Sequence, residues 1–127
     1  MTITIDTLVV ADPPEAWRGC GFHVDDDVCR VGSVGIRLVG RDAGRGIVGW
    51  SLRDGPAGLS DLDGIPTTAS NTAPGSGPTH ENGVVSIDHV VLLSPNLGRT
   101  VAALSGADDA KALGCTHALL GSEAKSL

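Results

Sequence analysis

The chain has 127 residues, with nine Lys and Arg against fifteen Asp and Glu, and its formal net charge is −6 at pH 7. This length suits one compact domain, and the acidic balance argues against nucleic-acid and membrane-surface partners, because both attract positively charged surfaces. Two Trp and one Phe, with no Tyr, are too few for a platform on which single-stranded bases stack. A small molecule or another protein remains as the partner.

We expect no signal peptide at the amino terminus. The first residues carry no basic segment before Asp6, and no apolar run approaches the ~18–20 residues that span a bilayer, so we expect a cytoplasmic protein. Cys20, Cys29 and Cys115 have no CxxC spacing, which is typical of reduced cysteines that act as small hydrophobic residues.

The first 53 residues predict the element order β-α-β-β-β. Alternating apolar residues over 3–10 indicate a strand, and Asp12 is predicted to cap a short helix that starts at Pro13, with Glu15 completing a capping box. A hairpin is expected from residues 22–24 and 28–31 around the acidic turn 25–27. Two further strands follow from the alternation of Val34, Ile36 and Leu38, and of Val48, Trp50 and Leu52.

The second part of the chain begins with a change of composition. Residues 54–83 are rich in Gly, Pro, Ser and Thr without sustained periodicity, which predicts a long loop or linker. An apolar run over 84–93 indicates another strand. Ser94, Pro95 and Asn96 then provide a helix start, and Leu97, Val101 and Leu104 follow at the spacing of one helical face.

The two strand openings resemble each other. Ile5-Asp6-Thr7-Leu8-Val9-Val10 and Ile87-Asp88-His89-Val90-Val91-Leu92 share Ile, Asp and three apolar residues in register, 82 residues apart, and each is followed by a proline and a short helix. This pattern favours a duplicated β-α unit.

The second of these segments, together with Ser94-Pro95-Asn96-Leu97, resembles the opening of a vicinal oxygen chelate module, of the glyoxalase/bleomycin-resistance/dioxygenase superfamily. The stretches 11–17, 46–52 and 80–83 are similar to an uncharacterised glyoxalase-like subgroup. The resemblance implies an α+β fold with paired βαβββ modules around a pocket, and it implies a divalent metal that acts as a Lewis acid in lyase, isomerase or dioxygenase chemistry.

The same resemblance implies a metal ligand at the third position of each opening strand. This position is His89 in the second unit and Thr7, a poor ligand, in the first. His80 is a further candidate, although a loop position is favoured for it. A catalytic site of this kind needs about three protein ligands, and residues 47–53 contain neither Glu nor His. Whether the chain is an enzyme is therefore left open.

The chain is too short for a complete second module. We divide it into a βαβββ module (1–53), a linker (54–83), a partial second module (84–105) and an atypical tail (106–127), in which a short helix is the most that the pattern offers. Truncation or a shifted reading frame would account for the tail. An incomplete second module leaves an open sheet edge, through which two copies would pair as a homodimer. A metal-free small-molecule-binding protein and an inactive truncated paralogue are the alternatives to an enzyme.

Overall fold

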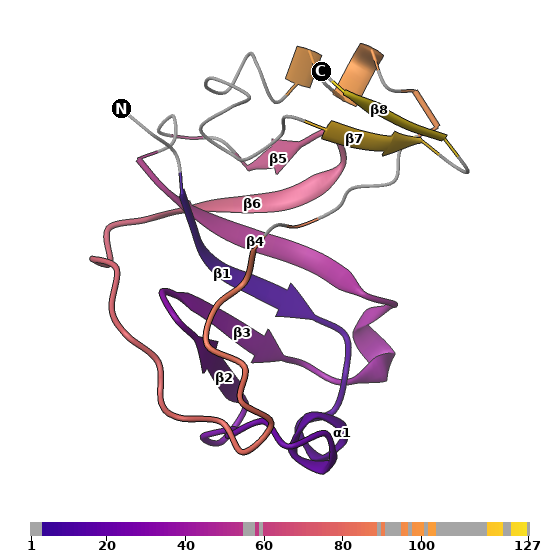
Figure 1. Cartoon of the computed structure of the whole chain (residues 1–127). Helices are drawn as coiled ribbons and strands as arrows, with labels where there is room; N and C mark the ends of the chain where they lie inside the picture. The colour runs from indigo at the N-terminus through magenta and orange to yellow at the C-terminus, as the bar shows by residue number, and fades with distance from the viewer. Residues whose placement is uncertain are drawn as a thin grey trace.

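The computed structural model describes the chain in the following ranges: residues 4–54, 58, 60–88, 90, 95–96, 98–100, 102–103, 117–120 and 123–126. Six strands form one mixed sheet in the order β2-β3-β1-β4-β6-β5 (Figure 1). Their bounds are β1 Thr4–Val10, β2 Val28–Val31, β3 Val34–Leu38, β4 Ile47–Arg53, β5 Asp61–Leu62 and β6 Ile65–Ser70. The short helix α1 (Pro14–Gly19) follows β1, and a 3₁₀ turn, η1 (Arg41–Ala43), precedes β4.

Strand β1 lies in the middle of the sheet. It pairs with β3 in parallel and with β4 antiparallel, while β4 pairs with β6 in parallel. A mixed sheet with few short helices agrees with the predicted α+β class. The chain order up to Arg53 is also the predicted one, a strand, a helix and three strands, whereas the family-specific βαβββ module stays a prediction.

One face of the sheet carries the hydrophobic core. The strand registers align a row of buried residues across five strands, and this row consists of Cys29, Ile36, Leu8, Trp50 and Thr67. The Trp50 indole donates a hydrogen bond of 2.8 Å to Thr67 Oγ1, so its polar edge is satisfied inside the core. Cys29 is completely buried, as expected of a hydrophobic cysteine, and burial raises the pKa of its thiol.

Two details of the first half differ from the prediction. Asp12 does not cap α1, whose N-cap is Pro13 without a side-chain bond; the Asp12 carboxylate instead accepts a 3.0 Å hydrogen bond from the Trp17 indole. Residues 22–24 form no strand, and the expected hairpin is reduced to a bridge between Asp25 and Val28. Asp26 lies in this tight turn with a positive φ of 58°.

The interpretation of 54–83 as a loop or linker was wrong in part. It contains β5 and β6, which are joined by a two-residue turn at Asp63 and Gly64 with φ of 53° and 87°. Positive φ at both positions is the geometry of an Asp-Gly hairpin turn. This dipeptide between Leu62 and Ile65 was the overlooked strand signal.

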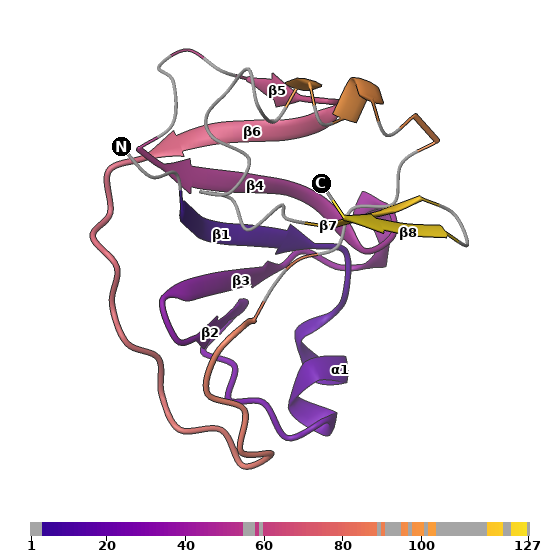
Figure 2. The ribbon, with the colours of Figure 1, turned by 45° about the horizontal axis from the view of Figure 1, so that its top comes forward.

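Residues 71–88, which we call the covering segment, run from the end of β6 past the edge strand β2 to α1 and then return over the sheet (Figure 1). Figure 2 shows the same path from a second direction. At the edge, Gly77 is so close to β2 that an added Cβ would lie 2.7 Å from the Arg30 carbonyl oxygen. Near α1, the Asn82 amide donates to the Gly21 carbonyl at 3.2 Å. The chain therefore covers its own β2 edge.

The prediction of a strand over 84–93 is not fulfilled in the part that the structure describes. Residues 84–88 and 90 lie outside any strand, although Val84, Ile87 and Val90 pack against the core. The predicted helix after Asn96 is present at residues 98–100 and 102–103. The Asn96 side chain caps it by accepting the Arg99 amide at 3.0 Å.

The tail contains two antiparallel strands, β7 (His117–Leu120) and β8 (Glu123–Ser126), so the expectation of at most a helix was wrong there. The two strands pair from His117 with Ser126 to Leu120 with Glu123, so their backbone groups bond to each other although the tail has no alternating pattern. The residues between the helix and β7 lie outside the described ranges.

Candidate functional site

The structure describes one of the two histidines predicted as metal ligands. His89 lies outside the described residues, so its role stays a prediction. His80 lies in the covering segment, outside any helix or strand, but it is buried, with 3 % of its surface exposed. The interpretation of His80 as a loop residue is correct for its backbone, whereas its side chain is part of the interior.

Both ring nitrogens of His80 bind the main chain. Nδ1 accepts the His23 amide at 2.8 Å, and Nε2 lies 2.9 Å from the Arg30 carbonyl oxygen. Because the amide of His23 can only donate, Nδ1 must be unprotonated and Nε2 carries the proton. A metal could bind His80 only after one of these bonds is broken. Within the described ranges, no group of three or more His, Cys, Asp or Glu side chains is placed to hold a metal ion.

A buried ion pair, Asp6 with Arg53, joins three strands and two loops. Arg53 Nη2 donates to Asp6 Oδ1 at 2.7 Å, and the guanidinium also donates to the carbonyl oxygens of Ile5, Ser33 and Thr72 at 2.8–2.9 Å. The second carboxylate oxygen of Asp6 accepts the Ser70 hydroxyl at 2.8 Å. Sequence reasoning missed this pair, because Asp6 interrupts the apolar strand only once and Arg53 is 47 residues away.

The environment of Asp6 keeps its carboxylate ionised. Burial alone would raise the pKa of Asp6, but the Ser70 hydrogen bond, the Arg53 charge and the weaker Ser51 and Thr7 bonds together hold this pKa below its ordinary value. Every charged atom of the pair has a partner, which is how a buried ion pair is tolerated. This arrangement supports the fold, because both carboxylate oxygens of Asp6 accept hydrogen bonds from other parts of the chain.

The face of the sheet opposite the core carries a second row of residues. The same registers align Arg30, Gly35, Thr7, Ser51 and Thr68 across β2, β3, β1, β4 and β6. Successive strand residues point to opposite faces, so this polar row lies behind the buried row from Cys29 to Thr67. We call it the polar row.

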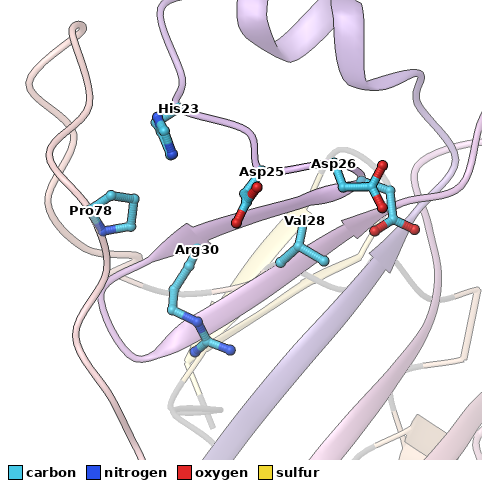
Figure 3. Close-up of a pocket in the computed structure, with 7 residues that line it drawn as sticks. His23, Asp25, Asp26, Val28, Arg30 and Pro78 are labelled. Carbon is cyan, nitrogen blue, oxygen red and sulfur yellow. The ribbon is translucent and has the colours of Figure 1, made fainter.

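A hollow of about 490 Å³ lies beside the end of the polar row, at the β2 edge. Its lining consists of His23, Asp25, Asp26, Asp27, Val28, Arg30 and Pro78. Figure 3 shows the guanidinium of Arg30 extending along the sheet, away from His23 and Pro78. Arg18, outside this lining, donates to the Asp26 carbonyl at 3.0 Å and Arg37 lies 3.7 Å from Asp27, so arginines surround the acidic turn.

A groove of about 400 Å³ opens on the core face, between the sheet, α1 and the returning chain. Its lining residues in the described part of the chain are apolar or glycine, namely Leu8, Val10, Trp17, Phe22, Val31, Ile36, Gly46, Ile47, Val84, Ile87 and Val90. The Trp17 and Phe22 rings are in contact, with centroids 4.8 Å apart. The described lining of the groove therefore offers contact area and aromatic surface but no charge.

Comparison with known proteins adds no assignment: no family model, curated protein or solved structure matches the chain. Among the residues that the structure describes, no helix is long and apolar enough to cross a membrane.

Proposed function

We propose that this protein is a metal-free small-molecule-binding protein whose ligand is uncharged and apolar. The observation that carries the proposal is the groove on the core face. Its volume of about 400 Å³ lies within the range of roughly 300–1,000 Å³ that ligand pockets occupy. The resemblance of residues 87–92 to a superfamily that includes binding members supports the same class of function.

The lining of the groove decides the chemistry of the ligand. Among the described residues, no charged side chain lines it, and the indole N–H of Trp17 is already bonded to Asp12, so a charged ligand would lose its hydration without gaining a partner there. An apolar ligand loses little on leaving water and gains contacts with Trp17 and Phe22. Each Å² of apolar surface removed from water contributes about 25 cal/mol, which is the main source of affinity expected here.

One wall of the groove is formed by residues outside the sheet. Val84, Ile87 and Val90 belong to the returning chain, and they face the sheet across the groove. Val85, their neighbour, points away and is 80 % exposed. This alternation gives a matched pair of positions, one that lines the groove and one that does not.

The experiment uses the neutral fluorescent probe N-phenyl-1-naphthylamine with wild type, Val84→Phe and Val85→Phe. Val84→Phe fills part of the groove, so we expect its Kd for the probe to rise at least fivefold, while Val85→Phe binds as wild type does. Circular dichroism checks that both variants are folded. Absence of saturable probe binding to the wild type, or equal Kd values for the two variants, would contradict the proposal.

A further inference from the structure

Arg30 differs from the other arginines of the described chain. Arg37, Arg53 and Arg99 each pair with an aspartate, and Arg18 donates to two carbonyl oxygens. Arg41 and Arg45 are exposed to water. Arg30 is half-buried, and within the described ranges its guanidinium has neither an ion pair nor a hydrogen bond.

Gly35 creates the space into which Arg30 extends. A Cβ added to Gly35 would lie 3.3 Å from Arg30 Nη2 and 3.5 Å from Thr7 Oγ1. The guanidinium and the hydroxyl therefore approach the same point above the sheet, where every other residue of the polar row has a side chain. The backbone conformation of Gly35 is not one that requires glycine, since its φ lies outside the positive range. The missing side chain is thus the distinguishing property of this position.

The carboxylate of Asp6, on β1, does not compensate the charge of Arg30. Asp6 lies next to Thr7, but its carboxylate is paired with Arg53 at 2.7 Å. Thr7 and Ser51 donate their hydroxyl protons to Asp6 at 3.4 and 3.3 Å, so their oxygens have lone pairs available as acceptors. Asp6, Arg53 and Arg30 together sum to one positive charge, while the acidic turn 25–27 lines the adjoining hollow.

From this geometry we propose that the polar row binds a small organic carboxylate, with Arg30 as the anion-binding residue. The fork of a guanidinium matches the two oxygens of a carboxylate. A hydroxyl or amine on the ligand would donate to Thr7 or Ser51, the acceptors that follow Arg30 and Gly35 in the row. This site lies on the opposite face of the sheet from the apolar groove and does not depend on it.

The surrounding acids favour a single negative charge on the ligand. Asp25, Asp26 and Asp27 line the adjoining hollow together with His23. Asp25 and Asp26 are exposed, so water and salt screen them, and Asp27 lies near Arg37. A monocarboxylate meets one cation at Arg30 without bringing a second negative charge close to this turn.

The test is an amide-resolved NMR titration of the full chain with sodium propionate, at ionic strength held constant with NaCl. Propionamide, which has nearly the same shape without the charge, is the matched ligand. We expect propionate, and not propionamide, to shift the amide signals of Gly35, Thr7 and Ser51. Arg30→Gln should weaken propionate binding at least tenfold, whereas Arg41→Gln, with the same change of net charge at an exposed position, should leave it unchanged.

A second variant keeps the charge and closes the space. Gly35→Ala should displace the Arg30 guanidinium and weaken propionate binding at least threefold. The Arg30 side chain makes no hydrogen bond in the described structure, so Arg30→Gln should fold, which circular dichroism verifies. Equal shifts with propionate and propionamide, equal binding by Arg30→Gln and Arg41→Gln, or no saturable shift in the wild type up to 50 mM propionate would each overturn the proposal.

Discussion

Arg53 Nη2 lies 2.7 Å from Asp6 Oδ1, and the two residues are only 5 % and 7 % exposed. This pair connects the beginning of the central strand β1 with the end of β4. The carbonyls of Ser33 and Thr72, which also bind Arg53, extend the connection to the β2–β3 turn and to the covering segment. The pair therefore fixes four parts of the chain at one end of the sheet.

Removal of the charge at position 6 should destabilise the protein strongly. Asp6→Asn leaves the buried Arg53 guanidinium without a counter-charge, and loss of one member of a buried pair costs about 3–5 kcal/mol. Urea unfolding followed by fluorescence measures the free energy of unfolding. Asp42→Asn, at an exposed position of η1, is the control. A loss below about 1 kcal/mol for Asp6→Asn would mean that the pair is not closed in solution.

Stability should also fall on acidification. The pKa of Asp6 is lowered in the folded state from its ordinary value of 3.8. A carboxylate of this kind contributes stability above its unfolded-state pKa, and this contribution is lost as the pH falls through the folded-state pKa. The free energy of unfolding should therefore decrease from pH 7 to pH 3. The decrease should be smaller in Asp6→Asn than in the wild type, and equal slopes would count against this assignment.

The covering segment should loosen when His80 is replaced. His80→Ala removes both ring hydrogen bonds and should cost about 1–3 kcal/mol, since the His23 amide and the Arg30 carbonyl lose their partner. Hydrogen exchange should quicken at the His23 amide and at its neighbours. His23→Ala is the matched control, because only the backbone of His23 takes part. Unchanged exchange in His80→Ala would show that other contacts hold the segment.

Contact between the covering segment and β2 is tested at two glycines. A Cβ at Gly77 would lie 2.7 Å from the Arg30 carbonyl oxygen, whereas a Cβ at Gly75 would have no atom within 4 Å. Gly77→Ala should therefore lower the free energy of unfolding by about 1–3 kcal/mol, as overpacking does. Gly75→Ala should leave it nearly unchanged. The same small effect for both variants would place the segment away from the β2 edge.

The metal hypothesis needs a direct measurement. If His89 is a ligand, elemental analysis of the purified protein should find stoichiometric divalent metal, and His89→Ala should lose it. His80→Ala should lose metal as well only if His80 gives up a backbone bond to coordinate it. If the wild-type protein contains no metal after incubation with zinc or manganese, the metal hypothesis is wrong, and the binding function proposed above is favoured.

The sequence predicted the parts of the fold that depend on local pattern. Alternation over Val34–Leu38 and around Trp50 located β3 and β4, because a strand with one buried face repeats every two residues. The strand β6, Ile65–Ser70, was missed because its residues are mostly small and polar and only Thr67 is fully buried. Its pairing with β4 is a long-range backbone interaction that local pattern does not reveal.

The site residues were harder to predict, because their roles come from contacts between distant positions. His80 was recognised as chemically notable, but its partners at positions 23 and 30 are 57 and 50 residues away. The distinguishing features of Arg30 are the space above Gly35 and the lack of an acid partner among the described residues. These features depend on which residues lie opposite each other in neighbouring strands. The sequence of a single chain does not specify that register here.

The central position of β1 has a consequence for the cooperativity of the fold. The pair β2–β3 and the group β4–β6–β5 have no hydrogen-bonded ladder in common except through β1. Detachment of Thr4–Val10 would divide the sheet into two fragments of two and three strands, each with a newly exposed edge. Unfolding should therefore be concerted, since neither half retains a complete layer once this first strand is withdrawn.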